Sequence, residues 1–187
     1  MTSTQEVNSS LCNEVPSVTG KNANTKKKKR ELEHVWAASP KYAYEYAHII
    51  LNKPWPLGEK AIASSPEYAC WYSTDVINGR WEPGEEAIAS VPQFAYTYAL
   101  LIIKKPWSPG ENAILTDPLY AYMYAQDIVK GRWEPGEKAI ASDAESAYGY
   151  ARDVIKGPWE PGEKVIASDS YWKQQYERHF KVKLPNA

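Results

Sequence analysis

The residues of this 187-residue chain that are of types able to carry catalysis or bind metals form no recognisable motif. The histidines His34, His48 and His179 lie far apart, and none has a Cys, Asp or Glu at metal-ligand spacing on a shared face. The sequence contains no glycine-rich phosphate loop and no nucleophile elbow. Cys12 and Cys70 form neither a disulfide framework nor a metal cluster. We therefore expect no catalytic residue, no metal site and no cofactor, and hence a protein that is not an enzyme.

Composition places the chain among globular proteins. Hydrophobic residues make up 43% of it and charged residues 24%, with a formal net charge of -1. No apolar run approaches the roughly 18 residues of a membrane span. The first 20 residues lack the basic and then apolar stretches of a secretion signal. The sequence therefore predicts a protein that is neither inserted in a membrane nor secreted.

The N-terminal segment differs from the rest of the chain. Residues 1–30 carry a net charge of +4, and the remainder carries -5. The first 25 residues are rich in Ser, Thr and Asn and hold no aromatic residue, so they bury too little apolar area to offset the entropy of ordering. We expect a disordered tail over 1–28, a helical repeat domain over 29–182 and a C-terminal tail over 183–187.

The tail ends in a run of basic residues, which are Lys26, Lys27, Lys28, Lys29 and Arg30. Such a run has two interpretations. It is either a nucleic-acid-binding arm or nuclear localisation signal, or simply a solvated lead into the first helix.

The body of the chain is a tandem repeat. Tryptophan recurs every 26 residues, at Trp55, Trp81, Trp107, Trp133 and Trp159. A Gly-Glu pair, an alanine and a tyrosine recur in step with it. Five units occupy residues 39–168, and partial units precede and follow them. This pattern is the signature of a solenoid, in which each unit packs on its neighbours.

Each unit predicts two helices. The first begins at a Ser or Asp N-cap, which is followed by proline in Ser39-Pro40, Ser65-Pro66 and Asp117-Pro118. Its alanines and tyrosines fall on one arc, which indicates a buried face. Glycines at 79, 131 and 157 are expected to end it in the left-handed conformation. The second helix is short and begins at Pro-Gly-Glu. The fold class is therefore all-α, an α-solenoid of about five two-helix units with capping half-units.

Residues that every unit shares are best explained by packing. We expect the tryptophans and tyrosines in the core, and the repeated glutamates at the positive ends of the second helices. Cys70 replaces a core tyrosine, which predicts a buried thiol. Arg80 and Arg132 precede their tryptophans, and we expect each of them to stack on that ring.

Positions that differ between units are the ones that hold information about function. Apolar residues stand on the first helices where the repeat favours polar ones, at Trp71, Leu100, Leu101, Leu119 and Met123, and the anchors we select among them are Trp71, Leu100, Leu101 and Met123. We expect them to form an exposed apolar patch that contacts a protein partner. The alternatives are that the patch lies under the tail or in a contact between copies of the chain.

The segment Ala-Tyr-x-Tyr-Ala-x-Asp-Val-Ile-Lys-Gly, at 147–157, and its continuation to Glu163 resemble short tandem repeats of bacteriophage and large DNA virus proteins. The resemblance covers residues 39–168. It implies a viral helical array in the host cytoplasm, or in the nucleus of a eukaryotic host, and transfers no active site. The layout also resembles tetratricopeptide and HEAT arrays, whose surfaces bind proteins. We therefore expect a protein-interaction module that binds a host factor or a virion component, with nucleic-acid association through residues 26–30 as the alternative.

Overall fold

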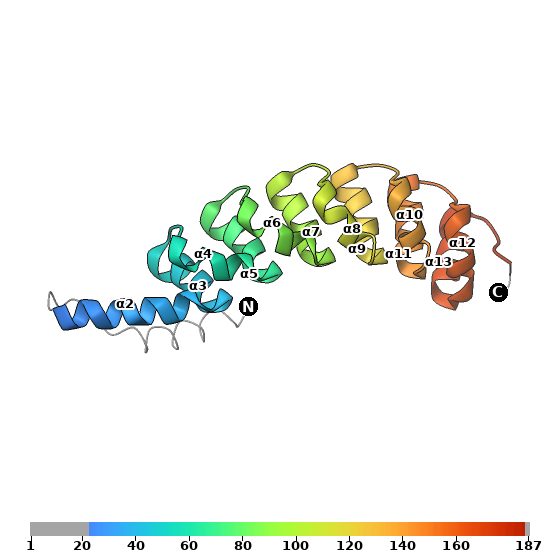
Figure 1. Cartoon of the computed structure of the whole chain (residues 1–187). Coiled ribbons are helices and arrows are strands. Elements are labelled where there is room, and N and C mark those ends of the chain that lie inside the picture. Colours follow the sequence, from blue (N-terminus) through green and yellow to red (C-terminus); the bar gives the residue numbers. More distant parts are fainter. Residues whose placement is uncertain (1–22, 186–187) are drawn as a thin grey trace.

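The computed structural model describes residues 23–185, and within them the chain forms helices and no strand. The repeat units follow one another along a curved row, in sequence order from α2 (Ala23–Ala37) to α13 (Ser170–Phe180) (Figure 1). First helices pack on the first helices of adjacent units along the whole array. Helix α2 and the second helices of the first three units also pack on one another in order, so the array has two layers. The predicted all-α helical solenoid is confirmed.

The first helix of each unit joins an α-helical part to a π-helical part. These pairs are α3 (Pro40–Glu45) with η1 (Tyr46–Leu51), α5 (Pro66–Trp71) with η2 (Tyr72–Ile77), α7 (Pro92–Tyr98) with η3 (Ala99–Ile103), α9 (Pro118–Tyr124) with η4 (Ala125–Val129), and α11 (Ala144–Gly149) with η5 (Tyr150–Ile155). The second helices are α4 (Pro56–Ala63), α6 (Glu82–Ala89), α8 (Ser108–Ile114), α10 (Glu134–Ile140) and α12 (Glu160–Ser168). Helix α2 (Ala23–Ala37) precedes the first unit, and α13 (Ser170–Phe180) follows the fifth.

The structure describes a helix that begins before residue 29 and a packed residue after residue 182. Helix α2 begins at Ala23 rather than at 29, because its Lys, Arg, Glu and Leu residues favour helix. Near the C-terminus, Leu184 is only 8% exposed, so the packed region extends past 182. Residues 1–22, which make up most of the predicted disordered tail, lie outside the described residues.

Aspartate and serine behave differently at the helix starts. Asp117, Asp143 and Asp169 accept hydrogen bonds from backbone N–H groups of the first turn, as expected of N-caps. Ser39 and Ser65 hold the expected N-cap positions with the same extended backbone, but their hydroxyls make no capping hydrogen bond.

The first helices end differently from the prediction. No described glycine has a positive φ, and the left-handed residues are Asn52, Asn78, Lys104, Lys130, Lys156 and Lys181. The π-helical turn is the cause: the N–H groups of Asn78 and Gly79 both donate to the carbonyl of Ser73, so the chain reverses one residue before the glycine. Helix α13 has no π-helical part, and its left-handed Lys181 follows Lys156 by 25 residues instead of 26.

Lysine in the left-handed conformation carries a local strain that glycine does not. We expect Lys130→Gly to raise the free energy of unfolding by about 0.5–1 kcal/mol, because relief of this strain exceeds the entropy that glycine adds to the unfolded chain. Urea unfolding followed by circular dichroism measures the change. Lys138→Gly, inside α10, is the control and should lower stability by about 1 kcal/mol. A Lys130→Gly variant less stable than the parent chain would contradict the assignment.

Candidate functional site

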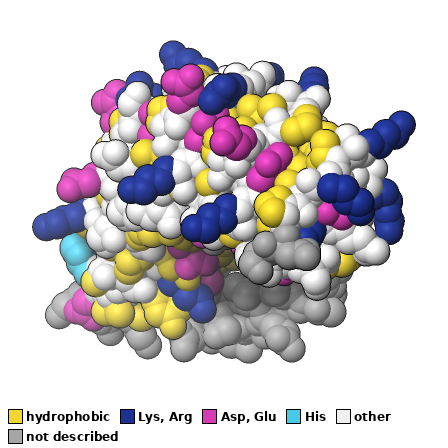
Figure 2. All heavy atoms as spheres, turned by 90° about the vertical axis from the view of Figure 1, so that its right-hand side faces the viewer, with side chains coloured by type: hydrophobic (Ala, Val, Ile, Leu, Met, Phe, Trp, Pro, Cys, Tyr) yellow, Lys and Arg dark blue, Asp and Glu magenta, His cyan; other side chains and the backbone are white. Residues whose placement is uncertain are grey.

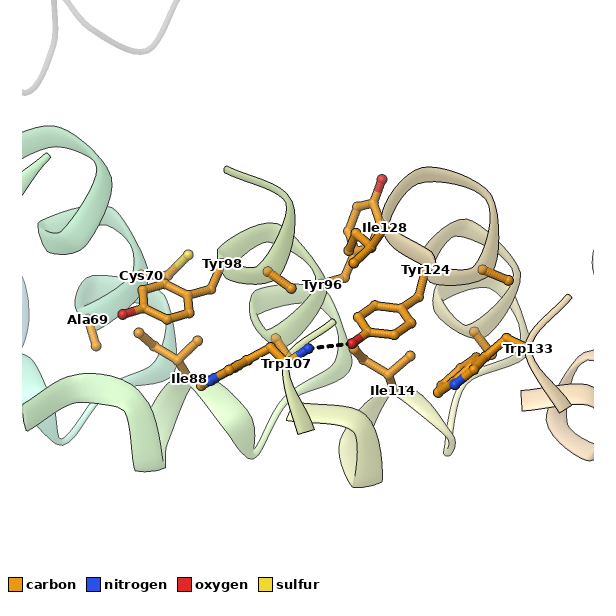
Figure 3. Close-up of a cluster of buried hydrophobic side chains, with 14 of the residues drawn as sticks. Ala69, Cys70, Ile88, Tyr96, Tyr98, Trp107, Ile114, Tyr124, Ile128 and Trp133 are labelled. Carbon is orange, nitrogen blue, oxygen red and sulfur yellow. Dashed lines mark hydrogen bonds between the residues drawn. The ribbon is translucent and has the colours of Figure 1, made fainter. Parts of the chain in front are cut away.

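A hydrogen-bonded tyrosine links each unit to the one before it. Its hydroxyl accepts a bond from the backbone N–H of the preceding unit's tryptophan, at 2.7–2.9 Å, and donates to that unit's glutamate, at 2.9–3.2 Å. Figure 3 draws one of these bonds, between Trp107 and Tyr124. The tyrosines are Tyr72, Tyr98, Tyr124, Tyr150 and Tyr176, and the glutamates are Glu59, Glu85, Glu111, Glu137 and Glu163. Because all three groups recur with the repeat, every junction between units is built alike.

Within each unit, ring packing holds the tyrosine and the tryptophan that form these junctions. The repeated tyrosine contacts its own unit's tryptophan at centroid distances of 4.6–5.0 Å in all five units. The tryptophan in turn covers the glycine three residues later. A Cβ on Gly84 would lie 2.6 Å from Cε3 of Trp81 and 2.9 Å from Cβ of Ala69. The repeated glycine is therefore required because the indole ring and the first helix leave no room for a side chain.

At the C-terminal end of the array, the corresponding backbone N–H finds its hydrogen-bond acceptor within its own unit. Leu184 occupies the place of the repeated tryptophan, and its backbone N–H donates to the carboxylate of Glu177 at 2.9 Å. In the other units a tyrosine of the following unit accepts that bond. At the opposite end, α2 acts as a second helix, because Glu33 accepts from the hydroxyl of Tyr46.

A second set of bonds joins the first helices. The hydroxyls of Tyr44, Tyr96 and Tyr122 each donate at 2.6 Å to an aspartate 31 residues further along the chain, and these aspartates are Asp75, Asp127 and Asp153. A fourth pair at this spacing, Tyr148 and His179, makes a ring contact instead. The sequence analysis placed these tyrosines in the core but did not find their partners.

One junction lacks this bond because both of its residues differ. Cys70 stands at the tyrosine position and Leu101 at the aspartate position. Cys70 is fully buried, as expected, and burial raises the pKa of its thiol to about 11. Leu101 is 50% exposed. The paired replacement is visible in the sequence and was the available signal for the Tyr–Asp bond.

The four predicted contact residues divide into two groups. Trp71 is 39% exposed, and its ring contacts Tyr44 and Tyr68 at 5.8 and 5.5 Å. Together with Leu101 it belongs to the exposed part of the predicted patch. Leu100 and Met123 are partly buried against the core and present less surface than expected, because the first helices pack side by side. The sequence analysis missed further exposed apolar side chains, which are Val35, Tyr42, Ile49, Ile50, Leu57 and Tyr171.

The two arginines that precede tryptophans form ion pairs instead of stacking on the rings. Arg80 donates from Nε and Nη2 to both oxygens of Glu85, at 2.6 and 3.0 Å. Arg132 pairs with Glu137 in the same way. The stacking expectation was wrong because each of these glutamates, which also accepts from a tyrosine, offers the guanidinium a bidentate partner.

The basic run at 26–30 lies within α2, and of its side chains only Arg30, which is exposed, is described. On the face in Figure 2, which looks onto the C-terminal end of the array, side chains of both charge signs are interspersed with hydrophobic ones. Over residues 23–185, no helix is long and apolar enough to cross a membrane. The same part of the chain holds no group of three or more His, Cys, Asp or Glu residues that could bind a metal ion.

A groove of about 380 Å³ lies between the connection from α8 to α9, the start of α9, and α10. Among the residues that line it, Lys138 is the one with an ionisable side chain, and the others include Leu115, Pro118, Pro135 and Ala139. This lining offers no acid–base pair for catalysis.

Comparisons with protein-family models, with curated proteins and with solved structures find no match to this chain. The candidate site therefore rests on the geometry alone.

The tyrosine hydroxyl between two units is expected to contribute measurably to stability. Tyr124→Phe removes the acceptor of the Trp107 backbone N–H and leaves that buried donor without a partner. We expect it to lower the free energy of unfolding by about 1–3 kcal/mol in a urea titration. Tyr42→Phe, at a residue 43% exposed, is the control and should change stability by less than about 0.5 kcal/mol. Equal stabilities of the two variants would contradict this role.

The raised pKa values of the repeated tyrosines predict that the chain unfolds at alkaline pH. Burial and the adjacent glutamates raise the pKa of Tyr46, Tyr150 and Tyr176 from 10.0 to about 12. A pKa raised on folding means that the folded chain holds the proton more tightly, so this stabilisation is complete below pH 10.0 and is lost as the pH rises towards about 12. We expect helical circular dichroism to fall in that window together with a rise in tyrosinate absorbance at about 295 nm. Tyrosinate formation with no loss of helix up to pH 12 would contradict the prediction.

Proposed function

We propose that the array is a non-enzymatic protein-interaction module, and that its apolar patch of Trp71, Leu100, Leu101 and Met123 contacts a protein partner. The observation that carries the proposal is Leu101. It is 50% exposed, at a position where other units hold an aspartate bonded to the preceding unit.

Leu101 stabilises this junction less than a bonded aspartate would. A buried or half-buried hydrogen bond contributes about 0.5–1.5 kcal/mol, and the junction of Cys70 with Leu101 forgoes it. A half-exposed leucine recovers only part of the free energy of burying its side chain. Burial of Leu101 under a partner would supply the rest. Trp71, on the first helix of the preceding unit, is of the residue type most often found at the energetic centres of interfaces.

The form of the array also supports an interaction role. Stacked units present an extended surface on which the variable positions differ while the junctions stay constant. With the resemblance to viral repeats, this favours a host factor or a virion component as the partner, met in the host cell.

A nucleic-acid role for Lys26–Arg30 is the second candidate. The run lies in α2, which leads out from the first unit at one end of the row (Figure 1). The net charge of -5 over residues 31–187 disfavours nucleic acid along the array itself. This candidate is therefore confined to the N-terminal arm.

A variant that repairs the missing bond separates stability from binding. Cys70→Tyr with Leu101→Asp recreates the pair found at three other junctions. We expect it to be as stable as the parent chain or about 1 kcal/mol more stable. We also expect it to lose a stoichiometric protein that the tagged parent chain retains from nuclease-treated host lysate. Retention of that protein by the repaired variant, and by Trp71→Ser with Leu101→Ser, would refute the patch.

Two controls accompany this experiment. Leu57→Ser changes a leucine of α4 that is 44% exposed, and it should leave capture unchanged. Replacing all five basic residues of 26–30 by Gln keeps the helix and should also leave capture unchanged. Loss of all captured material with this variant, or on nuclease treatment, would move the function to the basic arm.

A further inference from the structure

Three aromatic rings meet where the first and second units join. Tyr44 lies 5.9 Å from Tyr68 and 5.8 Å from Trp71, and Tyr68 lies 5.5 Å from Trp71, between ring centroids. The rings of Tyr68 and Trp71 meet edge to face at 90°. Tyr44 is buried and Tyr68 is partly buried, whereas Trp71 is 39% exposed. Solvent therefore reaches this aromatic cluster through the indole of Trp71.

Carboxylates surround the same cluster. Asp75 is exposed and accepts from the hydroxyl of Tyr44 at 2.6 Å. Glu45 is only 7% exposed and acts electrostatically on both Tyr44 and Tyr68. The cation paired with Glu45 is Lys41, whose Nζ lies 4.0 Å from the carboxylate, beyond hydrogen-bonding distance. Burial raises the pKa of Glu45, which means that its negative charge is poorly compensated in the free protein.

The chain contains a matched frame without these features. Tyr96 lies 5.9 Å from Tyr120 and donates to Asp127 at 2.6 Å, which repeats the geometry of Tyr44, Tyr68 and Asp75. The positions of Glu45 and Trp71 are held there by Thr97 and Met123, and His48, whose ring stacks on Tyr44 at 5.4 Å, is replaced by Leu100. Because this frame joins its units in the same way, stacking of the units requires neither Trp71 nor Glu45.

We propose that Trp71, whose ring contacts Tyr44 and Tyr68, binds an arginine side chain of the partner protein, attracted by the negative charges of Asp75, which is bonded to Tyr44, and of Glu45. This inference rests on the proposed function and names the chemistry of the partner's contact residue. The rings touch one another and leave no space between them for a ligand, so the guanidinium lies on the exposed side of Trp71.

Arginine fits this site better than lysine does. A guanidinium is planar and weakly hydrated, so it stacks on an indole face while its edge donates to carboxylates. Lysine carries a compact and strongly hydrated charge and cannot do both at once. The apolar stem of an arginine also packs favourably on exposed apolar side chains while the charged head stays paired.

The test uses N-acetyl-arginine amide as the probe and the neutral, isosteric N-acetyl-citrulline amide as its control. Both are titrated at constant ionic strength into the full chain labelled with ¹⁵N at its tryptophan indoles. The Trp71 signal is assigned by its absence in Trp71→Phe. We expect the arginine probe to shift this signal along a binding curve. The citrulline probe should bind at least about fivefold more weakly. Glu45→Gln should reduce the arginine response to the citrulline level.

The matched frame supplies the reciprocal variants. Glu45→Thr with Trp71→Met copies the second frame and should remove the response, whereas Thr97→Glu with Met123→Trp should add a second responding indole. Circular dichroism shows whether each variant keeps its helix content. Equal shifts by arginine and citrulline, or an arginine response unchanged in Glu45→Gln, would overturn the inference.

The outcomes remain separate from those of the proposed function. If the arginine probe fails while the parent chain still captures a protein that the repaired variant loses, the partner binds through apolar contacts alone. If the probe binds but no variant of the patch affects capture, the arginine site stands and the apolar patch does not.

Discussion

The repeated tyrosine hydroxyl is the interaction on which the array depends. It accepts from the buried backbone N–H of one unit's tryptophan and donates to that unit's glutamate, although it belongs to the next unit. An unpaired buried N–H is costly, so a unit of this sequence is incomplete until another unit follows it. The C-terminal unit escapes this requirement because Glu177 accepts from Leu184 within the same unit.

The two layers of the array differ in how strictly their residues repeat. In the second-helix layer each unit holds the same tryptophan, glycine and fully buried isoleucine, and the close approach of indole to glycine leaves no room for change. The first-helix layer is less constrained, because its Tyr–Asp bonds lie at the edge of the core. One such bond is replaced by Cys70 and Leu101 while both layers continue through that junction.

Departures from the repeat gather around the first three units. Trp71 replaces a residue that is Thr97 or Met123 in later units, and Glu45 places a poorly compensated charge beneath an aromatic cluster. Stacking of the units does not require these residues, since the frame of Tyr96, Tyr120 and Asp127 stacks without them. The recognition of another molecule that we propose would account for their presence.

The sequence by itself determined the number of units, the two helices in each, the buried residues and the absence of strands in the described chain. These follow from a 26-residue period and from residue types that act locally, such as proline at helix starts and apolar residues on one arc. Only the tertiary structure decided which groups pair. The tyrosine hydroxyls bond to groups 13, 17 and 31 residues away. Arg80 pairs with Glu85 instead of stacking on its tryptophan. Leu100 and Met123 are partly buried against the core. It also placed the left-handed turn at Asn78 and Lys130 rather than at the glycines that follow them. These pairings depend on how the units stack and on the π-helical turn at the end of each first helix. The 26-residue period shows that the same packing recurs in every unit, but it does not show the geometry of that packing.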